Sequence, residues 1–240
     1  MSGVLRAYFR SQQFDPGPPG LFLNPFFLAR RGLWKAIAKA AHSLRGRMLD
    51  VGCGIKPYRS LFQVDSYTGL DIDSEASRRR GVADVFYDGK RFPFDDASFD
   101  AVLCNQVLEH VFNPAEFLEE IRRVLGPDGR LLLTVPFVWD EHEQPWDYAR
   151  YSSFGLRALL ERHGFEVEAH EKLLDDASML FQLLNAYLFK VTRTPWIVAN
   201  LLITAVLMAP VSMLGLLAGW LLPRNPDLFL DQLVVARKAP

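Results

Sequence analysis

LDVGCG, residues 49–54, is the stretch that decides the fold of this 240-residue chain. Its apolar residues are typical of a buried strand, and Gly52 and Gly54 then predict a tight turn. Because glycine has no Cβ, the backbone of this turn can lie close to a ligand. Asp50 argues against a phosphate-binding loop, since its carboxylate would repel phosphate and such loops need a Lys-Ser/Thr pair. The turn therefore suits a ligand that carries positive charge.

Strands and helices alternate along the chain around this turn. Strands are predicted at 47–52, 66–71, 83–86, 99–104, 130–136, 165–173 and 228–237. Helices are predicted at 26–43, 114–125 and 153–163, whereas residues 1–23 are predicted to be an irregular arm. This alternation predicts the α/β fold class, with a parallel sheet that carries helices on both faces.

Further motifs follow the glycine turn in a fixed order. Asp71 ends the second strand about twenty residues beyond the turn, where nucleotide-binding sheets hold ribose hydroxyls. Behind it come YDGKRFPF at 87–94, SFDAVLCN at 98–105, VLEHV at 107–111 and EIRRVLGPDGRLLL at 120–133. Over residues 24–137 this ordered set resembles the class I S-adenosylmethionine-dependent methyltransferases. The resemblance implies a Rossmann-like seven-stranded sheet with an antiparallel last strand, and S-adenosylmethionine as the cofactor.

The resemblance also implies which residues meet the methionine end of the cofactor. Asp50, Gly52 and Gly54 would line it, with Asp50 near the ammonium group. Asn105 and Gln106 follow the fourth strand, where the family lines the same moiety. Their backbone carbonyls are expected to face it.

Two carboxylates are assigned to the nucleoside end by the same resemblance. Asp71 would hold the ribose. Asp88, with Gly89 beside it and Pro93 after it, matches the family acid that meets the adenine amino group. The alternative is that these carboxylates cap a strand end and a turn. The sequence departs from the family pattern at Lys56, which stands in place of the usual third glycine.

The acceptor is expected at the loop FVWDEHEQPWDYARY, residues 137–151, which resembles a bacterial subgroup often associated with surface-polysaccharide biosynthesis. Methyl transfer from a sulfonium needs orientation more than acid–base chemistry. His142 is nevertheless the candidate catalytic residue, because an imidazole can take a proton from a hydroxyl near neutral pH. The alternative is a packed, hydrogen-bonded corner. His110 is expected to be structural, and no metal is expected.

An apolar block is the second strong signal in the sequence. Residues 196–222 form a run of 27 without Asp, Glu, Lys or Arg, and ~20 would suffice for a membrane span. Predicted strands of one sheet precede and follow the block, so a single crossing is excluded. Pro210 interrupts the helical hydrogen bonds, which predicts a shallow hairpin that dips into one leaflet. A buried helical pair, a dimer interface and a true span are the alternatives.

Composition sets the remaining expectations. The formal net charge of −1 gives no case for nucleic-acid binding, and the two cysteines do not indicate a secreted disulfide framework. No secretory signal peptide is expected, so the protein is expected to be cytoplasmic, peripheral or monotopic at the inner membrane face. The chain is divided into an N-terminal arm and helix at 1–45, the cofactor-binding core at 46–175, the apolar insertion at 176–227 and the final strand at 228–240.

Three functions are compatible with these features. The first is a methyltransferase that acts on a glycan or a lipid-linked saccharide at the cytoplasmic membrane face. The second is a methyltransferase of a lipophilic small molecule, such as a quinone or polyketide, with the apolar block as a lid. The third is a non-catalytic, membrane-associated binding protein that keeps the fold. The acceptor and the oligomeric state do not follow from the sequence.

Overall fold

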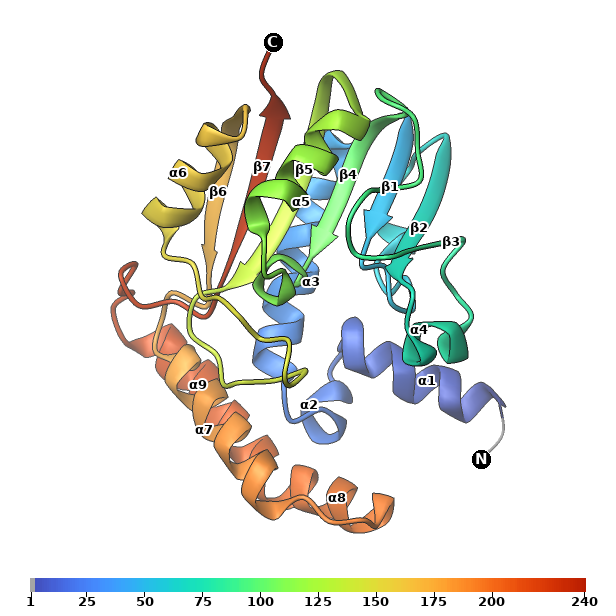
Figure 1. Cartoon of the computed structure of the whole chain (residues 1–240). Coiled ribbons are helices and arrows are strands. Elements are labelled where there is room, and N and C mark those ends of the chain that lie inside the picture. Colours follow the sequence, from blue (N-terminus) through green and yellow to red (C-terminus); the bar gives the residue numbers. More distant parts are fainter. Residues whose placement is uncertain (1–2) are drawn as a thin grey trace. The chain divides into compact units, whose positions relative to one another are not determined.

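The computed structural model describes residues 3–240, and side chains from residue 7 onwards. Its seven strands form one sheet in the order β3-β2-β1-β4-β5-β7-β6 (Figure 1). The strands are β1 (Arg47–Val51), β2 (Ser66–Ile72), β3 (Val85–Tyr87), β4 (Phe99–Asn105), β5 (Leu125–Pro136), β6 (Phe165–Leu173) and β7 (Asp231–Lys238). The predicted α/β class and the predicted Rossmann-like methyltransferase sheet are confirmed.

Strand β7 runs against its neighbours, as the resemblance implied (Figure 1). Just before β7, the N–H of Leu230 donates to the carbonyl of Leu173, at the end of β6. Just after β7, the N–H of Ala239 donates to the carbonyl of Gly164, which precedes β6. The start of β7 therefore meets the end of β6, which is the pattern of an antiparallel pair. The ladders of β3, β2, β1, β4 and β5 are parallel.

The helices occupy the connections between strands and the two regions outside the sheet. They are α1 (Gly3–Phe14), α2 (Gly20–Leu23), α3 (Phe27–Ala40), α4 (Glu75–Arg80), α5 (Pro114–Val124), α6 (Ser153–Arg162), α7 (Ser178–Thr192), α8 (Ile197–Ile203) and α9 (Ala209–Leu221). The prediction of an irregular arm at 1–23 was wrong, because α1 and α2 lie there. The side chain of Asn24 joins them by donating to the carbonyls of Gln12 and Gln13, the last turn of α1.

Helices α5 and α6 cover one face of the sheet (Figure 1). Alternate residues of β1, β4 and β5 point into this core, which follows from the two-residue period of a strand. The helices contribute fully buried side chains to it, among them Leu118 and Ile121 of α5 and Leu156 and Leu160 of α6. This packing fixes the strands, and with them the turns at their carboxyl ends.

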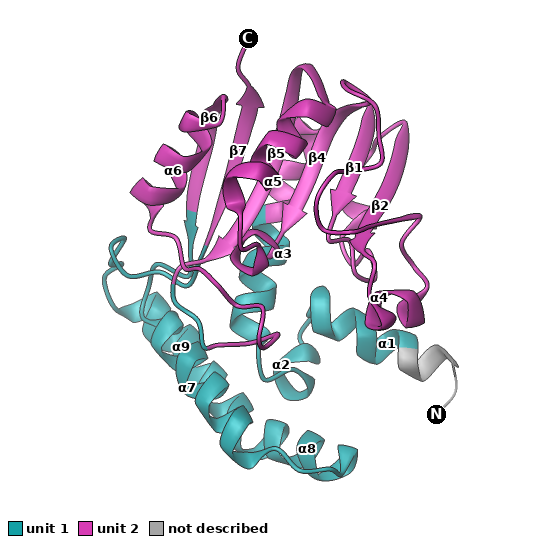
Figure 2. Cartoon of the chain, in the orientation of Figure 1, with its two compact units in different colours: residues 1–36, 138–140, 172–231 teal, residues 37–137, 141–171, 232–240 magenta. Residues whose placement is uncertain are grey.

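The chain divides into two compact units (Figure 2). Unit 1 comprises residues 1–36, 138–140 and 172–231, and unit 2 comprises residues 37–137, 141–171 and 232–240. All the residues that the sequence analysis assigned to cofactor or catalysis belong to unit 2. The apolar block belongs to unit 1.

Unit 1 contains an antiparallel helical pair, in which α7 lies along α9 (Figure 1). The side-chain amide of Asn185 on α7 joins them, because it donates to the hydroxyl oxygen of Ser212 at 2.8 Å and to the carbonyl of Met208 at 3.2 Å. The side-chain carbonyl of Gln182 accepts from the N–H of Ala29 at 3.1 Å, which ties α7 to α3 within the same unit. We call α7 together with Ile197–Leu221 the apolar hairpin.

The predicted break of the apolar block at Pro210 was wrong. Residues Ile197–Leu221 form one continuous helix of 25 residues, and the turn of the hairpin lies at 193–196 instead. A π-helical turn at Thr204–Met208 precedes Pro210 and accommodates its missing N–H, as such turns do within long helices. By length and composition this helix could cross a membrane. Its most apolar stretch of 18 residues has a mean hydropathy of 2.3 and is 28% buried.

Candidate functional site

The glycine turn after β1 is tight at one residue and open at the next glycine. Gly52 has φ +69°, and a Cβ there would lie 2.4 Å from a methyl group of Val107. Gly54 has φ +51°, but a Cβ there would meet nothing within 4 Å. The N–H of Gly52 donates to the carbonyl of Leu70 at 2.8 Å, which holds the turn against β2. The turn therefore has a fixed shape and leaves space beside Gly54.

Asp50 lies inside the sheet, on β1 just before this turn. The hydroxyl of Tyr67 donates to its carboxylate at 2.6 Å. Burial is the main cause that raises the pKa of Asp50 to about 7, and the hydrogen bond from Tyr67 opposes that rise. Asp50 is therefore a buried carboxyl group that changes charge near neutral pH. Its role toward the cofactor's ammonium group stays a prediction.

Two carboxylates lie at the ends of neighbouring strands. Asp71, on β2, is almost fully buried; one oxygen accepts from the N–H of Ile72 at 2.9 Å and the other from the guanidinium of Arg80 at 3.2 Å. Asp88 follows β3, accepts from the N–H of Lys90 at 3.0 Å and precedes Gly89, whose φ is +83°. Because β2 and β3 are parallel, both acids face the same edge of the sheet.

The end of β4 contributes Asn105 and Gln106 to the same edge. The hydroxyl of Thr134, on β5, donates to the side-chain oxygen of Asn105 at 2.8 Å. Gln106 has φ +54°, and its N–H donates to the carbonyl of Thr134 at 3.0 Å. The backbone therefore turns sharply at Gln106, immediately beyond the strand.

These residues fit S-adenosylmethionine by their chemistry. Each oxygen of Asp71 keeps a second lone pair beyond the bond that it makes, and these can accept from the two ribose hydroxyls. Asp88 can accept from an amino group in the same way. Ile72 exposes 48% of its surface beside Gly89 and offers an apolar wall to a flat ring. When bound, the cofactor would supply an activated methyl group at this edge.

The acceptor loop forms a fixed corner in unit 2. Two N–H groups of the Arg150 guanidinium donate to the two oxygens of Asp147, at 2.6 and 2.7 Å. This pair lowers the pKa of Asp147 to about 2. The Asp147 carboxylate also accepts from the N–H of His142 at 2.9 Å and lies 3.3 Å from its ring Nδ1. A permanent negative charge therefore holds the half-buried imidazole of His142.

The corner brings His110 against His142, which the sequence analysis did not predict. Their rings meet edge to face with centroids 4.8 Å apart, and Nδ1 of His110 lies 2.8 Å from the carbonyl of Trp146. Burial is the main cause that lowers the pKa of His110. The neighbouring Glu109 is fully buried, and its carbonyl accepts from the N–H groups of Tyr148 and of the following residue. The paired acid and imidazole in VLEHV were the available signal.

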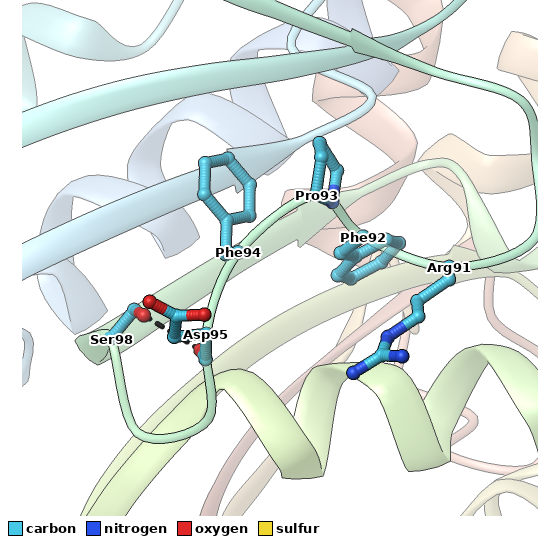
Figure 3. A pocket seen from close by; sticks show the side chains of 6 residues that line it. All are labelled: Arg91, Phe92, Pro93, Phe94, Asp95 and Ser98. Carbon is cyan, nitrogen blue, oxygen red and sulfur yellow. Dashed lines mark hydrogen bonds between the residues drawn. The ribbon is translucent and has the colours of Figure 1, made fainter.

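A surface depression of unit 2 lies away from these residues. It has a volume of about 500 Å³ and is lined by Arg91, Phe92, Pro93, Phe94, Asp95 and Ser98 (Figure 3). Ser98 precedes β4, whereas Asn105 ends it, so the two positions lie ~20 Å apart along the strand. The guanidinium of Arg123 donates to the carbonyls of Phe92 and Phe94, which gives this loop a structural role.

Comparisons with known proteins agree with the fold and with a methyltransferase domain. The family described as "Methyltransferase domain" matches residues 49–133. A probable S-adenosylmethionine-dependent methyltransferase of Mycolicibacterium smegmatis is 31% identical over 165 residues, which cover 62% of this chain and 63% of the relative. A fatty-acid O-methyltransferase of the same organism is 36% identical over 114 residues, which cover 42% and 41%.

The solved structures include the [4+2]-cyclase SpnF, with a TM-score of 0.56, 23% identity and coverage of 86% of this chain and 80% of that one. At this identity the likeness shows the fold alone. The chain spans about half the length of the curated relatives it matches. Residues 49–133 carry the family match and include the glycine turn, both acids and the end of β4. Through these residues the chain is similar to the methyltransferase-domain family, and the S-adenosylmethionine-dependent relative agrees with S-adenosylmethionine as the cofactor.

Proposed function

We propose that the protein transfers a methyl group from S-adenosylmethionine to a hydroxyl of a glycan or lipid-linked saccharide at the cytoplasmic face of the membrane. The observation that carries this proposal is the exposed apolar face of the hairpin in a chain with a methyltransferase domain. A soluble acceptor would not need such a face, because large exposed apolar patches are rare on monomeric soluble proteins.

The apolar hairpin supports contact with a membrane surface. Trp196, at the end of the turn, and Val206 and Trp220, on the second arm, are 74%, 74% and 80% exposed. Tryptophan favours the membrane interface, and these two tryptophans lie near the two ends of the helix. The first arm, α7, has 15 residues and would be ~23 Å long, which is short of a ~30 Å hydrocarbon core.

Two cations near the turn of the hairpin favour a shallow position. Lys190 pairs with Asp140 at 2.8 Å, and the guanidinium of Arg193 stacks on the ring of Phe189 at 5.8 Å. Charged groups at the centre of a bilayer are costly, whereas long basic side chains reach the interface easily. The hairpin is therefore proposed to lie in one leaflet along its apolar face, as monotopic helices do.

The acceptor loop supports a polar acceptor with a hydroxyl group. Exposed aromatic side chains, Phe112, Trp146 and Tyr148, surround the corner that holds His142. Aromatic faces and carboxylates suit a sugar ring, which has both apolar C–H faces and hydroxyls. His142 would take the hydroxyl proton, and the Asp147 carboxylate beside its Nδ1 would stabilise the imidazolium that forms.

The test is methylation of membrane lipids from the host. Purified protein, S-adenosylmethionine labelled in the methyl group and fractionated lipids should yield a labelled saccharide that mild acid releases from its lipid. The matched variant His142→Gln should bind the cofactor normally and lose most of the transfer. If label were found only in free fatty acids or quinones, the acceptor would be a lipophilic small molecule and not a saccharide.

The fatty-acid O-methyltransferase among the relatives favours that second candidate, since the same apolar hairpin would also suit a free lipid. Calorimetric titration with S-adenosylmethionine, together with the lipid assay, distinguishes these two methyltransferase candidates from a non-catalytic binding protein. A chain that binds S-adenosylmethionine but labels no lipid fraction would be a non-catalytic member of the family.

A further inference from the structure

The corner of unit 2 brings together three groups that bind metal ions. Glu109, His110 and His142 each offer a ligand atom, and these atoms all lie within 4.8 Å of one another. Nε2 of His110 lies 3.9 Å from a carboxylate oxygen of Glu109. We propose that these three residues bind a divalent transition-metal ion of the zinc class.

The neighbours of both imidazoles orient them for such a role. Nδ1 of His110 lies 2.8 Å from the carbonyl of Trp146, so this nitrogen carries the proton and Nε2 carries the lone pair. Nδ1 of His142 lies 3.3 Å from the Asp147 carboxylate, which assigns its lone pair to Nε2 as well. A backbone carbonyl and a carboxylate are the usual outer partners of metal-binding histidines.

The ligand set selects the kind of ion. Two imidazoles and one carboxylate are the protein ligands of many catalytic zinc sites, which keep a fourth position for water or substrate. Zinc–nitrogen distances of about 2.1 Å place tetrahedral ligand atoms about 3.4 Å apart. The 3.9 Å separation of His110 and Glu109 is therefore close to the required value, and modest side-chain rotation would close the rest.

Burial also suits a metal site. Glu109 is fully buried, whereas the side chains of His110 and His142 are 20% and 30% exposed. The buried carboxylate would thus bind the ion from the protein interior. A coordination position on the side of the imidazoles would remain accessible to solvent or substrate. Residues 109, 110 and 142 come from two segments of the chain, so the sequence alone gave no metal-ligand spacing, and the expectation of no metal is revised by this proposal.

The consequence for the chemistry rests on the proposed function. The open position would take the hydroxyl of the acceptor and lower the pKa of that hydroxyl, as a bound metal does for water. Its O–H bond breaks, the electron pair stays on oxygen and the proton passes to solvent. His142 would then be a ligand of the ion, and the ion would replace it as the group that activates the hydroxyl.

The decisive experiment measures metal binding by the full chain. Protein freed of metal by a chelator is titrated with Zn²⁺ in a calorimeter and with Co²⁺ by visible absorption. We expect one ion per chain and the intense Co²⁺ bands of a tetrahedral site. His142→Ala and Glu109→Gln should weaken binding at least 100-fold, and Asp147→Asn about 10-fold or more, as loss of an outer partner does.

The matched control is His163→Ala, because Nδ1 of His163 also lies beside a carboxylate, that of Glu119 at 3.7 Å. It should leave the Zn²⁺ affinity unchanged. Circular dichroism melts show whether Glu109→Gln folds, and the more exposed His142→Ala provides an independent reading. Binding that both His142→Ala and His163→Ala retain, or the absence of stoichiometric binding by the wild type, would overturn the site.

The catalytic role is tested separately with the acceptor that the lipid assay identifies. Chelated wild type should bind S-adenosylmethionine normally, lose methyl transfer and regain it with Zn²⁺. Full transfer without metal would overturn the role in catalysis while the proposed methyltransferase function stands. The stoichiometry and the Co²⁺ spectrum do not depend on any acceptor, so failure of the methyltransferase proposal leaves the metal test intact.

Discussion

The two compact units differ in the kind of side chain that each buries and exposes. Unit 2 buries its apolar side chains between the sheet and its helices, and it gathers carboxylates, an amide and imidazoles at the strand ends. Unit 1 buries polar side chains, such as Gln182 and Asn185, in its hairpin and exposes leucines and tryptophans. The hydrogen bonds of those buried amides hold the helices together beside a small apolar cluster that includes Ala29 and Met179. The proposed membrane contact of the hairpin therefore rests on an exposed apolar face, whereas the proposed cofactor site of unit 2 rests on polar groups.

The largest effect is expected at the turn of unit 2. Gly52→Ala adds a Cβ 2.4 Å from Val107 and requires a positive φ, which together should destabilise the protein by roughly 3 kcal/mol and abolish cofactor binding. Gly54→Ala is the matched control, because its φ is also positive but the space is open. Thermal unfolding and calorimetry check both variants. Equal stability of the two would mean that the contact with Val107 does not constrain the turn.

The next largest effect is expected on membrane binding, which should depend on unit 1 and not on unit 2. Leu202→Ser, Val206→Ser and Trp220→Ser, combined, remove three exposed side chains from the hairpin. Burial of each in a leaflet is worth ~1–2 kcal/mol, so binding to anionic vesicles should fall at least 100-fold, with little change in thermal stability. Phe154→Ser removes an equally exposed aromatic residue from unit 2 and should leave binding unchanged. Vesicle sedimentation measures this, and unchanged binding of the triple variant would contradict a membrane role for the hairpin.

The same contrast explains how far the sequence could be interpreted. Most strands were predicted within three residues at each end, because a buried strand is a short apolar run bounded by polar residues or glycine, whereas β5 begins at Leu125, five residues before its predicted start. The meeting of His110 with His142 was missed, since it depends on a loop that folds back over 3₁₀ residues Leu108–His110. In unit 1 the break at Pro210 was wrong, because a π-helical turn absorbs the missing donor. Local sequence patterns predict helices and strands, whereas contacts between side chains far apart in the sequence can be identified only once the fold is known.

A smaller effect concerns pH and the buried acid of unit 2. The pKa of Asp50 is raised in the folded state to about 7, so the folded state binds its proton more tightly and stability falls as pH rises from about 4 to 7. Asp50→Asn removes this penalty and should be more stable than wild type by about 2 kcal/mol at pH 8, with the difference lost at pH 4.

Asp100 gives the control of opposite sign. The guanidinium of Arg47 lowers its pKa, so its contribution is present above the unfolded pKa and is lost as pH falls. Asp100→Asn should therefore destabilise the protein at pH 8. Denaturant unfolding at the two pH values measures both variants, and a destabilised Asp50→Asn at pH 8 would show that the Tyr67 bond outweighs burial.

The smallest effect tests a single contact at the polar edge. Asp71→Ala removes two acceptor oxygens, and because a hydrogen bond to a charged group contributes ~1.5–3 kcal/mol, S-adenosylmethionine should bind at least tenfold more weakly. Arg80 donates to the same carboxylate, so Arg80→Ala should leave affinity equal or slightly better by removing a competitor for its oxygen. Asp73→Ala, on an exposed acid paired with Arg78, is the control and should change affinity less than twofold. If calorimetry gave Asp71→Ala the affinity of the wild type, the buried carboxylate would be a partner of Arg80 and the cap of Ile72, and the ribose would be held elsewhere along the edge.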